Sequence, residues 1–203
     1  MMTPLRGLAV FAVLQSGCLG RDAAAPRFYH PDATTLGAPI DPPPGPATRT
    51  SVRLRPVHEA GFLRERMVWR VSEVEYGRYE QRRWNELPAQ YVTRAMTNAL
   101  QASPTLLLSG DLVAASLALD LLAFDEVVGT PHVARVTVRA SLRAPSSGTL
   151  LDREFVVEEP ITGDGGSAVA RAMGKALDGV VAQVSTEVAA RLTAGSAPRR
   201  PTR

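Results

Sequence analysis

The chain has 203 residues, a formal net charge of +3 at pH 7 and a single cysteine. Its 23 basic and 20 acidic side chains are interspersed, so there is no concentrated basic tract of the kind that binds nucleic acid, and no nucleic-acid partner is expected. One cysteine excludes an intramolecular disulfide and a metal site built from several thiolates.

A short apolar run near the N-terminus precedes the cysteine. Leu8–Leu14 follows Arg6 and leads through two small residues to Cys18. A spanning helix needs about 20 apolar residues, so a run this short behind a basic start is typical of a secretory signal. The junction resembles the bacterial lipobox, although Gln15 stands where the lipobox prefers Leu. We expect a signal peptide over residues 1–17 and lipid attachment at Cys18; the alternative is an ordinary signal peptide with a chance cysteine.

A lipid on Cys18 would determine where the protein works. Each buried methylene contributes about 0.8 kcal/mol and one acyl chain binds only marginally, whereas two or three chains hold a protein on its membrane. Leu19 follows the cysteine, in the place where inner-membrane lipoproteins of many Gram-negative bacteria carry Asp. We therefore expect an anchor in the periplasmic face of the outer membrane.

The lipidated N-terminus and a Pro-rich linker are predicted over residues 18–50. Seven prolines interrupt any periodicity there: Pro26, Pro31, Pro39, Pro42, Pro43, Pro44 and Pro46. A coil of this length would span roughly 30 Å and polyproline II up to about 100 Å, which predicts a domain that stands clear of its membrane. Phe28 and Tyr29 are the aromatic exception. They either form a short edge strand or dock on the domain, or they are incidental in a solvated linker.

The first strands are predicted at the start of a domain over residues 51–193. Apolar residues alternate with arginines over Ser51–Val57, which indicates a core strand. Met67–Glu75 alternates again, and Tyr76–Tyr79 is expected to turn the chain into a partner strand. On this pattern Met67, Trp69 and Val71 share the inward face.

A helix is predicted to follow Trp84–Pro88. Proline loses no amide in the first turn of a helix and its fixed φ suits that position. The stripe of an amphipathic helix on a sheet follows at Tyr91 or Val92, Ala95, Met96, Ala99 and Leu100. Ser103 and Pro104 are expected to end the helix.

Three further strands are predicted after this helix. Leu106–Phe124 fits either a buried helix or a strand, and alternation over Leu117–Leu122 favours a strand in its second half. Val133–Arg143 alternates clearly, as expected of a sheet with one solvated side. Pro145–Gly148 has turn chemistry, and Thr149–Glu158 completes a hairpin.

The last predicted element is a helix of about seven turns. Its apolar stripe runs from Val169 to Leu192, and residues 194–203 are expected to form a disordered basic tail. The order of elements predicts an α+β fold, a mainly antiparallel sheet with two helices packed on one face. We expect one domain behind the Pro-rich tether.

The sequence lacks the patterns of catalytic and metal sites. His30, His58 and His132 are scattered without the spacing of metal ligands, and no GxSxG occurs. Gly163–Gly166 precedes a helix and could cradle an anion, but the phosphate-loop pattern is absent. We therefore expect no enzyme, no cofactor and no metal.

Three stretches, at Val52–Val57, Phe62–Arg70 and Trp84–Pro88, together resemble the ABC-type transport auxiliary lipoproteins, the PqiC-like family. Val52–Val57 resembles its V-x-x-P-V strand, Phe62–Arg70 its F/Y-L-x-R segment and following strand, and Trp84–Pro88 its W-x-E-x-P motif. Phe28 and Tyr29 resemble the family's N-terminal tyrosine strand, so the resemblance covers roughly residues 18–193. It implies a non-catalytic docking subunit at the outer membrane that serves an MCE-type lipid transporter, whose ATPase and permease lie in the inner membrane.

The candidate partner contacts are Phe28, Tyr29, Trp84 and Pro88. Trp84 lies in a polar, arginine-flanked stretch and is expected to be a partly exposed interface anchor; alternatively it closes the end of the core. The partners expected are the membrane, through the lipid anchor, and the MCE-domain protein, while a homo-oligomer is left open. A rival interpretation is a TolB- or LpoB-like lipoprotein that binds a cell-wall synthase. A periplasmic hydrolase is the enzyme-class rival, disfavoured by the missing nucleophile and base.

Overall fold

The computed structural model describes residues 24–37 and 49–195. The predicted signal peptide, Cys18, the central part of the Pro-rich linker and most of the basic tail lie outside these residues, so the predictions made for them remain predictions. Neither helix in the described ranges combines the length and apolar character needed to cross a bilayer.

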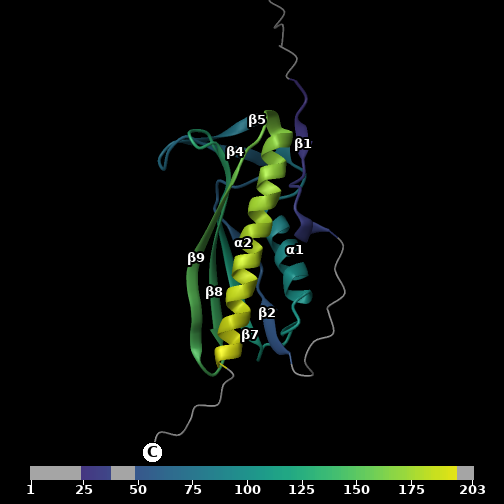
Figure 1. The fold of residues 1–203 in the computed structure, drawn as a ribbon, viewed down its shortest axis with the longest axis vertical. Helices are drawn as coiled ribbons and strands as arrows, with labels where there is room; N and C mark the ends of the chain where they lie inside the picture. The colour runs from purple at the N-terminus through teal and green to yellow at the C-terminus, as the bar shows by residue number, and fades with distance from the viewer. Residues whose placement is uncertain (1–23, 38–48, 196–203) are drawn as a thin grey trace, which may run out of the picture.

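A three-stranded antiparallel meander forms the largest part of the sheet (Figure 1). It consists of β7 (Ala115–Val127), β8 (Val133–Ala144) and β9 (Gly148–Pro160). Leu117, Leu119 and Leu121 of β7 are fully buried, and the residues between them are more exposed, as alternation along a strand requires. The strand predicted in the second half of residues 106–124 is therefore confirmed, and it continues to Val127.

The remaining strands lie on the other side of β7. They are β1 (Arg27–Tyr29), β2 (Thr50–Leu54), β3 (His58–Glu59), β4 (Arg66–Arg70), β5 (Tyr76–Trp84) and β6 (Leu106–Leu108). β2, β3 and β4 run parallel to successive parts of β7, β6 is parallel to β2, and β1 is parallel to β5. These parallel pairings are short, whereas β4 and β5 pair antiparallel. The sheet is thus mainly antiparallel, as predicted, with parallel pairings that the sequence did not indicate.

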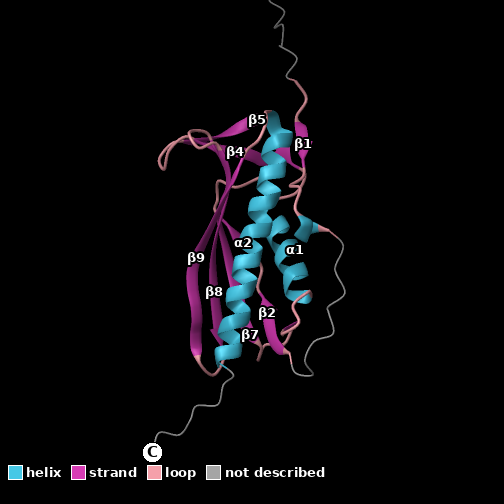
Figure 2. Cartoon of the chain, viewed as in Figure 1, coloured by secondary structure: helices cyan, strands magenta, loops and turns pink. Residues whose placement is uncertain are grey.

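Both helices cover the same face of the sheet (Figure 2). α1 spans Pro88–Gln101 and α2 spans Gly165–Gly195. The apolar stripes predicted for them are buried against the sheet; in α2 they include Val180, Val184 and Val188. The predicted α+β class, with two helices on one face, is confirmed.

The β4–β5 turn differs from its prediction. It lies at Val71–Glu75, where the amides of Val71 and Ser72 donate to the Glu75 carbonyl at 3.0 and 3.4 Å, and Tyr76–Tyr79 belongs to β5. Gly77 is not a turn residue: a Cβ there would collide with the Trp69 ring, which packs on the glycine. Trp69 is consequently only half-buried and Val71 is exposed, so the expected inward face holds for Met67 alone.

Residues 27–37, here called the docked segment, pack on the domain. One of the alternatives left open for Phe28 and Tyr29, a short edge strand, is present as β1, and a short 3-10 helix, η1 (Thr34–Leu36), follows it. The main chain lies so close to α2 that a Cβ on Gly174 would overlap the backbone of Asp32. The folded unit therefore begins at Arg27, well before the boundary predicted at residue 51.

Candidate functional site

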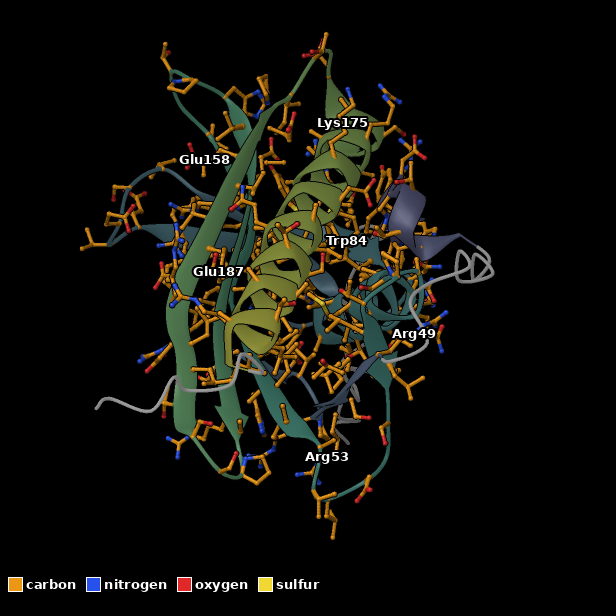
Figure 3. All side chains as sticks on the ribbon, turned by 60° about the horizontal axis from the view of Figure 1, so that its bottom comes forward. Arg49, Arg53, Trp84, Glu158, Lys175 and Glu187 are labelled. Carbon is orange, nitrogen blue, oxygen red and sulfur yellow. The ribbon has the colours of Figure 1, made fainter. Side chains whose placement is uncertain are left out.

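Trp84 sits where β5 ends, inside a cluster of aromatic rings. Its ring meets Phe124 of β7 edge-on at a centroid distance of 5.2 Å and Tyr91 of α1 at 6.3 Å. Only 1% of its surface is exposed, and Figure 3 shows it in the interior behind α2. The expectation of a partly exposed anchor is wrong, because the ring fills the space between β5, α1 and β7. The alternative interpretation, that Trp84 closes the end of the core, describes the structure.

The residues after Trp84 fix the start of α1. The Glu86 amide donates to the Tyr91 hydroxyl at 3.1 Å, and that hydroxyl donates to the Asn85 side chain. The Glu86 carboxylate accepts three contacts of 2.9–3.1 Å from the Arg94 guanidinium. Burial raises the pKa of Tyr91 to about 12, so its hydroxyl stays protonated and available to these bonds. The W-x-E-x-P motif is therefore a structural joint between sheet and helix.

The four candidate contact residues do not form one exposed surface. Tyr29 pairs with Trp84 along the β1–β5 register, and the Asn85 amide donates to the Tyr29 carbonyl at 3.0 Å. Pro88 is buried at the first position of α1, whereas Phe28 is 60% exposed on β1. Of the four, Phe28 is exposed, Tyr29 is half-buried, and Trp84 and Pro88 are buried.

A groove runs along one flank of α1. It has a volume of about 780 Å³ and lies between α1, the chain from Arg53 to Val57, and the end of β6. Its floor and walls are made by small and apolar side chains: Leu54, Pro56, Val57, Ala89, Thr93, Thr97 and Leu108. Arg53, near the lower end of the molecule in Figure 3, and Arg55 supply positive charge, and the described residues that line the groove include no carboxylate.

The groove joins two of the sequence stretches that carried the resemblance. Arg53–Val57, from the first stretch, forms one wall. Ala89, Gln90 and Thr93, which come soon after Trp84–Pro88, form the other. The sequence did not predict this, because nothing in either stretch indicates that the two are neighbours in space. An apolar groove with positive charge suits an extended peptide segment that carries apolar and acidic side chains.

Two buried acidic residues near the end of β7 were also missed. Asp125 is fully buried and accepts from Arg70 Nε at 2.9 Å and Arg135 Nε at 3.2 Å. Burial on its own would lower the pKa of Arg135, but hydrogen bonding and attraction to Asp125 outweigh it and raise that pKa. Asp125 thus joins β4 and β8 across β7. The two guanidiniums balance the charge of its buried carboxylate.

Glu126 organises the neighbouring group of polar side chains. It accepts a hydrogen bond from the Tyr79 hydroxyl at 2.9 Å, lies 2.8 Å from His132 Nε2, and faces Arg82 at 3.7 Å. Burial, with the nearby Glu126 carboxylate, raises the pKa of Tyr79 to about 12. Asp125 and Glu126 follow directly after the apolar run Leu121–Phe124 of the same strand, and this pair of adjacent carboxylates was the signal in the sequence.

The three histidines have different neighbours in the fold. His132 contacts Glu126, the His30 ring lies 5.3 Å from the Tyr91 ring, and His58 pairs with Asp120 across β3 and β7. In residues 24–37 and 49–195, no group of three or more His, Cys, Asp or Glu side chains is arranged to hold a metal ion.

Comparisons with known proteins give a consistent result. The model of a family described as ABC-type transport auxiliary lipoprotein component matches residues 35–185. A crystal structure of a Xanthomonas campestris protein of the DUF330 family is 18% identical, with a TM-score of 0.67 over 84% of this chain and 99% of that chain. The crystal structure of an uncharacterized protein is 12% identical, with a TM-score of 0.64 over 81% of this chain and 99% of that one. At these identities the structural likeness shows the fold alone, and no curated protein sequence matches the chain.

Proposed function

The chain belongs to the ABC-type transport auxiliary lipoprotein family, and from that membership we propose that it is a non-catalytic subunit of an MCE-type transporter that moves lipid between the two membranes. The coarser part follows from the family itself: an auxiliary lipoprotein of a Gram-negative envelope that associates with a transport system. The proposal adds an anchor at Cys18, a place at the outer membrane and the MCE-domain protein as partner.

The observation that carries the proposal is the extent of the family match. It runs from the docked segment to the middle of α2 and so includes both walls of the α1 groove. A docking subunit needs a surface that recognises another chain and needs no assembly of acid, base and nucleophile. We place the MCE protein in the groove, through an extended segment whose apolar side chains face Leu54 and Val57 and whose carboxylates meet Arg53 and Arg55.

The test is capture of the partner by the full-length lipidated protein from cells after cross-linking. Thr93→Arg places a long charged side chain in the groove, whereas Thr186→Arg makes the same change on the exposed side of α2. We expect Thr93→Arg to reduce recovery of the MCE protein at least about tenfold, equivalent to about 1.4 kcal/mol of binding energy. Thr186→Arg should leave recovery unchanged.

The other outcomes are informative. Equal capture by both variants would move the contact away from the groove. Recovery of a cell-wall synthase in place of the MCE protein would favour the TolB- or LpoB-like interpretation.

The anchor is tested separately by mass spectrometry of the mature N-terminus. A lipid-modified Cys18 is expected, and Cys18→Ser should leave the precursor uncleaved at this site. An unmodified mature chain that begins elsewhere would contradict the anchor and the outer-membrane location.

A further inference from the structure

The position of β1 limits how far the domain can stand from an anchor on Cys18. Figure 1 shows that the described chain begins at the same end of the molecule as β5 and the start of α2. Only residues 19–26 separate Cys18 from Arg27, the first residue of β1. Fully extended at about 3.3–3.6 Å per residue, this stretch reaches roughly 30 Å. It replaces the long tether expected over residues 18–50, because the docked segment is part of the domain.

The length of α2 determines which end of the domain can reach the membrane. α2 has 31 residues, and at 1.5 Å per residue it is about 45 Å long. The β1 end lies beside its N-terminus, where the Tyr29 ring packs against Gly166, and the opposite end lies beside Leu192. Because residues 19–26 reach less far than the length of α2, the β1 end must lie nearer to the membrane than the opposite end does.

An exposed aromatic residue lies at this end. Phe28 is 60% exposed on β1, beside Arg83 of β5. Its neighbour Arg27 pairs with Arg82, and because side chains alternate along a strand, these two arginines lie at the same end of the molecule but on the other face of β1. An exposed aromatic ring at an end that also carries arginines suits the interfacial layer of a bilayer with anionic headgroups.

A cavity of about 560 Å³ opens at the same end. Arg27, Arg78 and Arg82 line it together with Tyr29, Tyr79 and the first residues of α2, Gly165 and Gly166. Glu80 and Gln81 complete the described lining. Several guanidiniums in one concave surface suit phosphate oxygens, and the N-terminus of α2 adds partial positive charge.

The tyrosines position two of these arginines. The Arg82 guanidinium stacks over the Tyr79 ring at 4.2 Å and also faces Glu126 at 3.7 Å, and the Arg27 guanidinium lies 6.0 Å from the centre of the Tyr29 ring. Arg78 Nε donates to the Phe62 carbonyl at 3.1 Å. Each arginine is thus oriented by the protein and still lines the cavity.

From these observations we infer that the β1 end of the domain lies on the membrane that carries its own lipid. Phe28 enters the interfacial layer, and Arg27, Arg78 and Arg82 bind the phosphates of anionic lipid headgroups. The inference rests on the proposed acylation of Cys18. The domain would contact the membrane surface directly, and would not stand away from it at the end of a long linker.

The main experiment uses the full lipidated chain in vesicles and a single introduced cysteine. Acylated Cys18 has no free thiol, so an environment-sensitive fluorophore labels only the new site. Phe28→Cys is compared with Leu112→Cys, an apolar residue that is 76% exposed in the loop before β7, next to the end that Leu192 occupies. Vesicles are phosphatidylcholine alone or phosphatidylcholine mixed with phosphatidylglycerol.

We expect the label at residue 28 to shift its emission to shorter wavelength and to be quenched by spin-labelled lipids, whereas the label at residue 112 behaves as in water. A label at Gln81, on the exposed side of β5, gives a second reading should the change at Phe28 disturb β1. Water-like emission at residues 28 and 81 in vesicles that carry the protein would overturn the inference.

The arginines are tested in the Phe28→Cys background. Arg27→Gln with Arg78→Gln should abolish the extra quenching that phosphatidylglycerol causes, whereas Arg143→Gln with Arg153→Gln, two exposed arginines on β8 and β9, should preserve it. Equal loss in both pairs would show that the effect is one of total charge, and would overturn the assignment to the cavity.

Flotation separates the two proposals. A protein that does not float with vesicles contradicts the anchor, and with it this inference. A protein that floats but whose labels are exposed to water contradicts the inference alone.

Discussion

One flank of α1 is covered by another part of the chain, and the other flank is open. One flank faces α2 and is covered by the docked segment, whose Thr35 and Gly37 carbonyls accept hydrogen bonds from Asn98 Nδ2 at 2.8 and 3.1 Å. The other flank faces the β2–β3 chain and stays open as the groove lined by Thr93 and Thr97. The same helix therefore presents one groove that the docked segment fills and one that the described residues leave open.

The covered flank shows what such a groove needs in order to hold an extended peptide. Asp178 of α2 accepts four hydrogen bonds of 2.5–3.0 Å, from the amide and hydroxyl of both Thr34 and Thr35. Gly174 gives the backbone of Asp32 room to lie against the helix. Recognition is by main-chain groups and small residues, and the described lining of the open flank contains neither a carboxylate nor an equivalent asparagine. The open flank is therefore suited to a segment recognised by its own side chains.

The largest loss of unfolding free energy is expected for a change in the core beneath α1, at Trp84. Trp84→Ala removes the ring that packs on Tyr91 and Phe124 and should cost about 3–5 kcal/mol of unfolding free energy. Trp69→Ala, at a half-buried position, should cost clearly less. Denaturant unfolding of the two variants measures this order, and an equal or reversed cost would contradict the placement of Trp84 in the core.

A substitution with a smaller expected cost should displace the docked segment from α1 and α2 and leave the rest of the fold intact. Gly174→Ala adds a methyl group where the backbone of Asp32 lies, so the docked segment must shift or leave, at a cost of about 1–3 kcal/mol. Hydrogen exchange at Thr34 and Thr35 should become fast while β7 and β8 stay protected. Gly61→Ala is the control, because a Cβ there meets nothing within 4 Å.

The covered flank should also open in acid. Burial alone would raise the pKa of Asp178, but hydrogen bonds from Thr35 and Thr34 outweigh it, and the pKa lies below its ordinary value. Asp178 therefore stabilises the fold fully above the pKa of the unfolded chain, about 3.9, and this stabilisation is lost as pH falls through the lower folded value.

Asp178→Asn should remove this pH dependence and cost about 1–2 kcal/mol at neutral pH, since the side chain is only half-buried. The measurement is unfolding free energy from pH 7 to pH 3 for both proteins. Parallel curves would show that Asp178 does not contribute.

The smallest effect contrasts two consecutive residues of α1. Asn98→Ala loses two hydrogen bonds to the docked segment and should cost about 1 kcal/mol. Thr97→Ala, in the open groove, should change the unfolding free energy by less than about 0.5 kcal/mol. If Thr97→Ala were the more costly change, the groove would not be an open surface.

Periodicity was enough to predict the elements whose burial is regular. β8 and β9, α1 and α2 follow alternation or a helical stripe, and their order gave the fold class. The β4–β5 turn was misplaced because Gly77 looks like a turn residue, whereas it makes room for a ring 8 positions earlier in the chain, Trp69. Local sequence contains no information on such cross-strand packing.

The candidate site was less accessible to sequence reasoning. Trp84 has polar neighbours on both sides, and its burial depends on Tyr91 and Phe124, which reach it from other elements. Phe28 and Tyr29 were recognised as an aromatic island, but the partners of the docked segment on α2 lie far along the chain. The groove likewise arises from stretches that meet only in the folded protein.

The hydrogen bonds between Thr34 and Asp178 join residues 144 positions apart. An exported chain that emerges N-terminus first presents the docked segment at the start and its partners on α2 near the end. Closing so long a loop is entropically unfavourable until the helix pair has formed, so this contact belongs to the last stage of folding. Until then the docked segment can pair only with β5 and α1, which emerge earlier than α2. The proposed acylation of Cys18 would therefore precede the docking on α2 in time, and the order in which the chain emerges would leave the cysteine accessible to the modifying enzymes.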